Sequence, residues 1–173
     1  MKTIDYLKQF LIPFAGLKTG THKYHFSISK EFLSHFNFSD IEDLCGELNF
    51  SLDKQTALLT LNFEWKGTIK TLCDRCGDDL ELPINSTQEL FIKFGPEPRE
   101  ENEKIIIIST DETEIDISQY IYEFITFAIP FKKAHPQGKC NKESLKKLNE
   151  IKSTEKKKTI DPRWQELLKI KLS

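Results

Sequence analysis

Two cysteines three positions apart, Cys73 and Cys76, are followed at once by Gly77 and are flanked on both sides by strand-like sequence. This spacing suits a tight turn that points both sulfur atoms at one metal ion, and glycine can adopt the positive φ that such a turn often needs. The turn then supplies half of a tetrahedral zinc site. Clustered candidates for the other half occur in His-Pro-Gln-Gly-Lys-Cys, which contains His135 and Cys140. We therefore predict a structural zinc site at Cys73, Cys76, His135 and Cys140.

Other interpretations of the cysteine pair remain open, because the two thiols also suit a redox pair or a purely structural role. A redox pair usually sits at a helix N-terminus, where the helix dipole lowers the thiol pKa. Here strand-like sequence follows, and Asp74, Asp78 and Asp79 oppose thiolate formation. His135 precedes a proline and is also explained as an exposed loop residue. Cys45 stands apart, and we expect it to pack as a small apolar group.

Alternating apolar and polar residues predict a series of antiparallel strands. The alternation covers residues 24–28, 48–52, 59–65, 80–84 and 89–94. The segment 68–72 leads into the cysteine turn, so we expect this turn at the tip of a hairpin. The run 105–108 is apolar throughout, which favours either burial on both faces or pairing in the interior of the sheet. The acidic, proline-bearing segment 95–103 is predicted to be a surface loop.

A helix is predicted from Ser118, as its N-cap, to about Phe127, with Pro130 beyond its end. Apolar residues fall on two of its faces, which indicates a deeply buried, central packing element. The expected fold class is α+β: an antiparallel sheet of about six strands packed on this central helix, with a basic helical C-terminal tail.

The charge of the chain divides at about residue 131. Residues 1–131 hold 12 Lys/Arg and 22 Asp/Glu, a net charge of −10, whereas residues 132–173 hold 13 and 5, a net charge of +8. We therefore predict an acidic α+β body over 1–131, which includes the cysteine turn, and a basic helical tail over 132–173. A basic tail attracts phosphate groups, because binding them releases counterions. The predicted RNA contacts are Arg75, Lys132, Lys133, Lys139, Lys156, Lys157, Lys158 and Arg163. The alternative is that these charges only solvate a helix face.

No apolar run approaches the roughly 20 residues that cross a bilayer, and the N-terminus lacks the order of a secretory signal. We therefore expect a cytoplasmic protein with no membrane partner, in which the thiols stay reduced. His22 and His25 are interpreted as residues of a surface strand, since no third metal ligand accompanies them.

Several motifs occur in an order that resembles the YceD family, bacterial proteins associated with accumulation of the large-subunit ribosomal RNA. They are Leu17-Lys18-x-Gly20, Cys73-x-Arg75-Cys76, an acidic loop, Ile115-Asp116-Ile117, Glu123, Ile129-Pro130, and Asp161-Pro162-Arg163-Trp164 with Leu167 and Leu168. The resemblance covers most of the chain. Family members commonly carry a second cysteine cluster that completes a metal site with the first; here that region holds only Cys140, with His135 before it.

The resemblance implies a non-enzymatic role in ribosome biogenesis that supports 23S ribosomal RNA accumulation. The expected partners are ribosomal RNA precursor, a large-subunit ribosomal protein, or both, and no small-molecule substrate. The sequence itself offers no phosphate-cradling glycine loop and no nucleophile motif, so we do not expect an enzyme. The alternative is a protein-interaction module that never contacts RNA.

Overall fold

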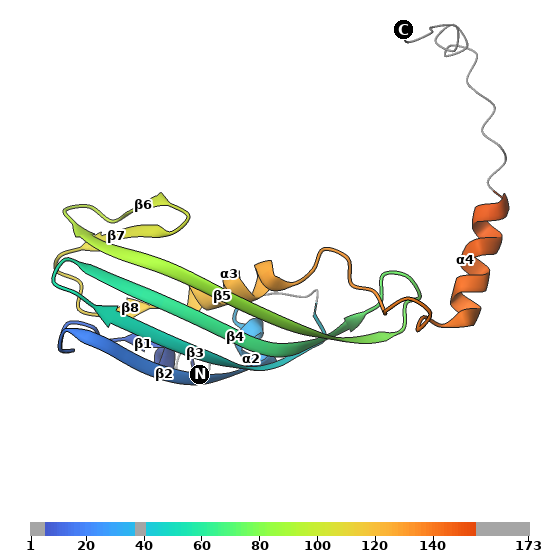
Figure 1. Ribbon diagram of the computed structural model, residues 1–173, viewed down its shortest axis with the longest axis horizontal. Coiled ribbons are helices and arrows are strands. Elements are labelled where there is room, and N and C mark those ends of the chain that lie inside the picture. Colours follow the sequence, from blue (N-terminus) through green and yellow to red (C-terminus); the bar gives the residue numbers. More distant parts are fainter. Residues whose placement is uncertain (1–5, 37–40, 155–173) are drawn as a thin grey trace, which may run out of the picture.

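A computed structural model describes residues 6–36 and 41–154 and shows an α+β fold built on one six-stranded sheet (Figure 1). The sheet has the strand order β2-β3-β4-β5-β7-β6, and a separate two-stranded pair joins β1 to β8. The strands are β1 (Leu11–Ile12), β2 (Gly20–Ser29), β3 (Asp43–Lys54), β4 (Leu58–Leu72), β5 (Asp79–Gly95), β6 (Arg99–Asn102), β7 (Ile105–Ser109) and β8 (Ile115–Asp116). The helices are η1 (Lys8–Phe10), α2 (Lys30–Ser34), α3 (Ser118–Ala128) and α4 (Lys142–Thr154).

Strands β2 to β5 form a continuous antiparallel meander, which confirms the predicted hairpins. Strands β4 and β5 are 15 and 17 residues long and pair along their length, from Leu58 with Lys93 to Leu72 with Asp79. The segments 80–84 and 89–94 are therefore one strand rather than two. The long hairpin carries the cysteine turn to one end of the molecule, away from β6 and β7 (Figure 1).

The sheet is mixed rather than purely antiparallel, because β7 pairs in parallel with β5. Strand β7 lies between β5 and β6, so the apolar run of isoleucines is inside the sheet, as predicted. The prediction of a surface loop over 95–103 is wrong in part: Arg99–Asn102 forms β6 and pairs with β7. Backbone pairing overrides the polar composition here, since an edge strand can present charged side chains to water.

One face of the sheet carries the hydrophobic core. Its central strands contribute buried residues such as Phe50, Leu61 and Phe63, which cluster with Phe10, Phe32 and Ile121 from the helical segments. Aromatic rings link the two layers, since the Phe63 ring lies 5.1 Å from that of Phe124 in an edge-on arrangement. The core therefore forms between the meander and a discontinuous layer of short helices.

Helix α3 has the predicted extent but not the predicted cap or burial. The carboxylate of Asp116, rather than the Ser118 hydroxyl, accepts a hydrogen bond from the first helical N–H, that of Ser118, at 2.8 Å. Ile121 and Ile125 are buried, whereas the side chain of Phe127 is 79% exposed. Helix α3 thus buries one of its two apolar stripes against the sheet, and the end of its second apolar stripe is exposed to solvent.

Two glycines face each other where the indole of Trp65 lies against strands β3 and β4. Gly46 pairs with Gly67, and a Cβ atom at either position would fall within 2.4 Å of the Trp65 ring. The same atom at Gly46 would also lie 2.6 Å from the Cα of Gly67. Only glycine permits this approach, so the pair makes room for a tryptophan that is 2% exposed.

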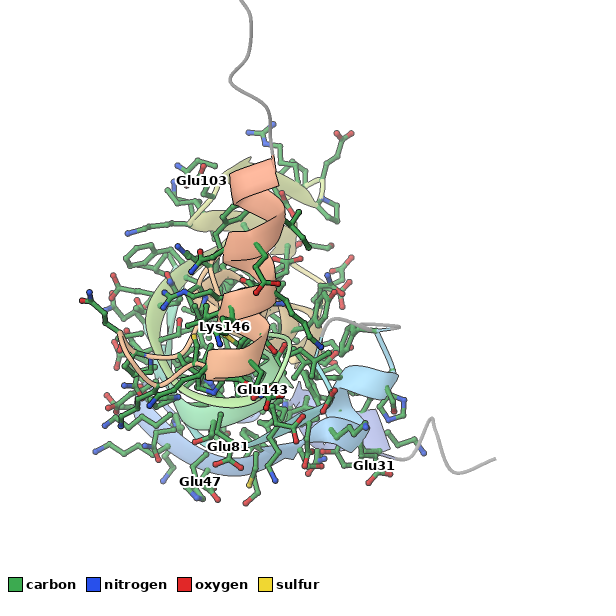
Figure 2. The ribbon with its side chains drawn as sticks, turned by 90° about the vertical axis from the view of Figure 1, so that its right-hand side faces the viewer. Glu31, Glu47, Glu81, Glu103, Glu143 and Lys146 are labelled. Carbon is green, nitrogen blue, oxygen red and sulfur yellow. The ribbon has the colours of Figure 1, made fainter. Side chains whose placement is uncertain are left out.

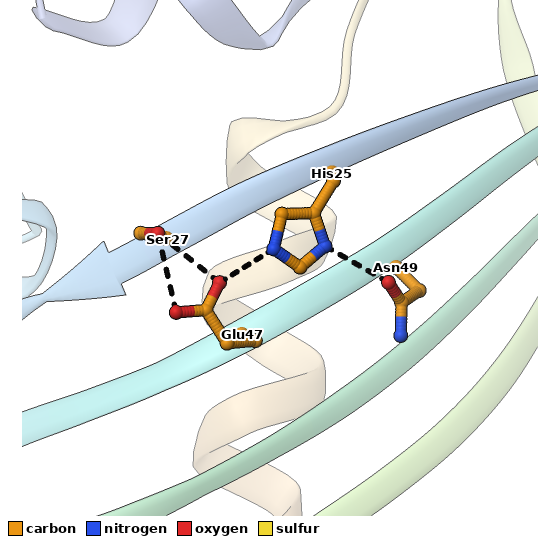
Figure 3. A network of polar contacts seen from close by, with 4 residues as sticks. All are labelled: His25, Ser27, Glu47 and Asn49. Carbon is orange, nitrogen blue, oxygen red and sulfur yellow. Dashed lines mark hydrogen bonds and ion pairs between the residues drawn. The ribbon is translucent and has the colours of Figure 1, made fainter.

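The opposite face of the sheet is polar and is not covered by α3, which lies behind the strands in Figure 3. On this face the imidazole of His25 contacts Glu47 at 2.8 Å and Asn49 at 2.9 Å, and Ser27 donates to Glu47. Cys45 is exposed, so the prediction that it packs as an apolar residue is wrong. This network fits the interpretation of His25 as a surface-strand residue.

Candidate metal centre

The four predicted ligands lie together at the tip of the β4–β5 hairpin. Cys73 and Cys76 come from the turn, and His135 and Cys140 come from the segment that connects α3 to α4. One ligand atom from each residue lies within 4.8 Å of every other. The Sγ atoms of Cys73 and Cys140 are 4.0 Å apart, and the Sγ of Cys76 is 3.4 Å from the Nδ1 of His135. Two segments about 60 positions apart in the chain therefore converge on one point.

The backbone of the turn is arranged as the Cys-x-x-Cys-Gly sequence predicts. The N–H of Gly77 donates to the carbonyl of Cys73 at 2.8 Å, and the N–H of Cys73 donates to the carbonyl of Asp78 at 2.8 Å. Gly77 has a φ of 77°, the left-handed conformation that favours glycine. The turn thus closes on itself and holds both sulfurs on its inner side.

Asp74 fastens the turn to the second segment, a role that the sequence analysis did not identify. Its N–H donates to the carbonyl of Lys133 at 2.7 Å, and its carboxylate accepts from the N–H of Lys133 at 2.6 Å. The N–H of His135 also points at the Sγ of Cys73, at 3.4 Å. An acidic residue between two cysteines gives no sign of this pairing, because the partner is a backbone group distant in sequence.

The orientation of His135 suits a metal ligand. Its Nε2 lies 3.1 Å from the carbonyl of Asp79, and its Nδ1 faces the Sγ of Cys76. Because a carbonyl only accepts, Nε2 carries the proton in the neutral ring and Nδ1 presents its lone pair toward the sulfurs. Metal-binding histidines commonly have their second nitrogen held in this way by a carbonyl or carboxylate.

The surroundings of Cys73 and Cys140 shift the pKa values of their thiols in opposite directions. Burial raises the pKa of the Cys73 thiol, but hydrogen bonds from the backbones of His135, Arg75 and Cys76 and from the Cys76 thiol outweigh it and lower the pKa to about 6. Burial raises the pKa of the Cys140 thiol, and the neighbouring thiols add to this effect. The hydrogen bond with Cys76 raises the pKa of His135. Cys73 therefore has more thiolate character than Cys140, and thiolate is the form that binds metal.

The donor set fits zinc. Three thiols and one imidazole are the ligands of a closed structural site, in which bonds of about 2.0–2.3 Å place the ligand atoms roughly 3.3–3.8 Å apart. The Cys76–His135 separation of 3.4 Å already lies in this range, the Cys73–Cys140 separation of 4.0 Å lies just above it, and no pair of ligand atoms is more than 4.8 Å apart. Cys73 and Cys140 are 2% and 5% exposed, and Cys76 and His135 are half-buried. The Cys73 and Cys140 side of the cluster is thus shielded from water, with Leu80, Leu82, Ala134 and Leu145 packed around it.

Helix α4 begins directly after the last ligand. The side chain of Asn141 accepts hydrogen bonds from the N–H groups of Glu143 and Ser144, at 2.9 and 3.4 Å, and so caps the helix. Leu145, one turn into α4, contacts the small apolar cluster around Cys73 and Cys140. In Figure 1 the helix projects from the end of the sheet at this point. The ligand cluster therefore lies at the base of α4.

Four of the predicted RNA contacts lie in the loops of this centre. Arg75 is in the cysteine turn, and Lys132, Lys133 and Lys139 are in the connecting segment. The structure brings these two loops together through the Asp74–Lys133 hydrogen bonds. Exposed lysines of α4 continue the basic sequence: Lys142, Lys146 and Lys147. The predicted contacts Lys156, Lys157, Lys158 and Arg163 lie outside the described residues.

The fold and the cluster define a class: an α+β protein with a mixed six-stranded sheet and a Cys3His cluster at the tip of a long hairpin. The sequence model of the family described as large ribosomal RNA subunit accumulation protein YceD matches residues 61–171. The chain belongs to the YceD family. The matched segment includes all four residues of the Cys3His cluster. Searches of curated proteins and of solved structures found no match. Among the described residues, no helix is both long and apolar enough to span a membrane.

Proposed function

We propose that this protein is a non-enzymatic ribosome-biogenesis factor that supports 23S ribosomal RNA accumulation by binding ribosomal RNA precursor, a large-subunit ribosomal protein, or both. Membership of the YceD family carries this proposal, since the family is described by accumulation of the large ribosomal RNA subunit. A cytoplasmic location follows from such a role.

In this proposal the metal is structural. Zinc at Cys73, Cys76, His135 and Cys140 would join the hairpin tip to the base of α4 and fix the direction in which this helix leaves the body. No ligand position remains open in a four-ligand site, so the metal supplies no catalytic chemistry. Its contribution is to order two loops and one helix that bury little apolar surface of their own.

The proposed RNA-binding surface comprises these ordered loops and the basic segment that follows. Arg75, Lys132, Lys133 and Lys139 surround the cluster in sequence, and residues 132–173 carry a net charge of +8. Rigid presentation lowers the entropy that these side chains lose on binding phosphate. Residues 1–131, with a net charge of −10, disfavour RNA, so we propose a division into an acidic body and a basic RNA-binding tail.

Crosslinking by ultraviolet light in growing cells tests this proposal. Bound RNA is sequenced, and the crosslinked peptides are identified by mass spectrometry. We expect large-subunit ribosomal RNA precursor, attached to peptides within residues 132–173 or the turn around Arg75. Recovery of no RNA, together with copurification of a ribosomal protein, would favour the protein-interaction alternative. Exposed aromatic residues at the end of α3 are the observation that supports this alternative.

A further inference from the structure

The acidic body has a groove with an apolar floor and an acidic rim. It has a volume of about 230 Å³ and lies between α3 and the β6–β7 hairpin. Leu90, Ile106 and Phe124, which are buried or half-buried, form the floor, and Phe127 also lines the groove. The carboxylates at the rim are Glu100, Glu103 and Glu123. This groove is separate from the metal centre, which lies at the opposite end of β5.

The exposed side chain of Phe127 marks the groove as a contact surface. Phe127 is 79% exposed although its helix neighbours Ile121 and Ile125 are buried, and Phe131, just beyond α3, is fully exposed. Aromatic residues contribute strongly to protein interfaces when they become buried there. A single large side chain of a partner would fill the volume beside Phe127.

The rim determines the charge of the partner. Within the described part of the chain, none of the three rim glutamates forms an ion pair; Glu123 accepts only from the amide of Gln119. Burial raises the pKa of Tyr120, which lines the groove, and the charges of Glu100, Glu123 and Asp116 raise it further, in agreement with the acidic rim. Figure 2 shows Glu103 at the opposite edge of the molecule from Glu47, so these charges are distinct from the polar network on the open face.

We propose that this groove binds a lysine- and arginine-rich protein segment through one apolar anchor side chain. Nucleic acid and anionic membranes are repelled by the rim, and the acidic body of a second copy is repelled as well. A basic segment instead gains from both features: its anchor covers Phe127, and its charges face the carboxylates. The inference rests on the proposed function only in that a ribosome-biogenesis factor encounters basic proteins.

The test uses the full chain and a fluorescein-labelled synthetic peptide of alternating lysine and arginine with one central tryptophan. Fluorescence anisotropy measures its affinity for the unaltered chain and for variants. We expect Phe127→Ser to weaken peptide binding about tenfold or more. We expect the same loss with the unaltered chain when serine replaces the central tryptophan of the peptide. Glu123→Lys should also weaken binding. Glu89→Lys is the matched control, because Glu89 is exposed and adjoins the floor residue Leu90 but alternates to the other face of β5.

If Glu89→Lys and Glu123→Lys weaken peptide binding equally, the proposal is overturned, because the peptide would then be attracted by the overall negative charge of the body rather than by the groove. Equal binding of the tryptophan and serine peptides would also overturn it. Benzoylphenylalanine, a photoreactive residue, is placed at position 127 to test two other occupants of the groove. Crosslinks to residues 142–173 of the same chain, or to a second copy of the protein, would show that the groove binds this protein itself and would overturn the proposal. None of these measurements involves ribosomal RNA, so a failure here leaves the outcome of the cellular crosslinking unaffected.

Discussion

Removal of the zinc proposed at the Cys3His cluster should lower the stability of this protein and release α4. The cluster ties Cys73 to Cys140, which are 67 positions apart. Closing a loop of this length costs an unfolded chain about 4 kcal/mol of conformational entropy, by the relation used for disulfides. This relation holds for zinc that stays bound in the unfolded chain, as a disulfide does, whereas zinc that is released on unfolding stabilises the fold by its binding free energy instead. We therefore expect chelation to lower the free energy of unfolding by about 2–4 kcal/mol, or the melting temperature by roughly 5–12 °C.

The assay combines three measurements on the full chain. Elemental analysis should give about one zinc per chain. Circular dichroism should show the lower melting temperature after chelation, and amide hydrogen exchange should accelerate in residues 133–150 while the β2–β4 core remains protected. Cys140→Ser should reproduce the chelated state, whereas Cys45→Ser, which changes an exposed cysteine outside the cluster, should not. Metal-free protein with unchanged melting would refute the argument.

Three further predictions concern the body of the protein. Gly46→Ala should lower the free energy of unfolding by at least about 2 kcal/mol in denaturant titration, because the new Cβ atom would clash with the backbone of Lys66 and Gly67 as well as with Trp65. A loss below about 0.5 kcal/mol, which is the usual effect of a surface substitution, would show that the strands move apart easily. Lys54→Met should cost about 1–3 kcal/mol, since the ammonium donates to three backbone carbonyls between residues 14 and 17 at 2.8–3.0 Å, and unchanged stability would mean that water replaces it fully. Because the pKa of Tyr120 is raised above its ordinary value of 10, its contribution to stability is complete below pH 10 and is lost as the pH rises through the folded-state pKa. Tyr120→Phe should make this alkaline decline shallower in pH-dependent melting, and an unchanged decline would contradict the shift.

Local patterns explain why much of the fold follows from the sequence. Alternation over Leu48–Leu52 and Leu59–Trp65 specifies the faces of β3 and β4, because a shift of one residue would expose the core side chains. The turn at Cys73–Gly77 and the extent of α3 also depend on neighbouring residues. The cysteine pair and the two clustered candidates His135 and Cys140 were predicted from the sequence to form one group, and the fold brings these four residues together.

The failures of sequence analysis have a common cause. Three features were predicted wrongly because each depends on which element packs against or pairs with the residues concerned. They are the exposure of Cys45, the inclusion of Arg99–Asn102 in the sheet and the exposed end of α3. A residue's own chemistry gives no information about that element. Composition predicted an acidic loop, but pairing with β7 supplies backbone hydrogen bonds that composition does not record.

The sequence by itself thus determined the strand segments of β2 to β5 and β7, the extent of the main helix, the division of charge and the candidate ligands, because each depends on residues close together in the chain or on simple counts. Only the tertiary structure decided that β7 joins the sheet in parallel, that Asp74 binds the backbone of Lys133, and that an acidic-rimmed groove forms beside Phe127. These features arise between segments distant in sequence, and packing and backbone hydrogen bonding select such contacts only when the whole chain has folded.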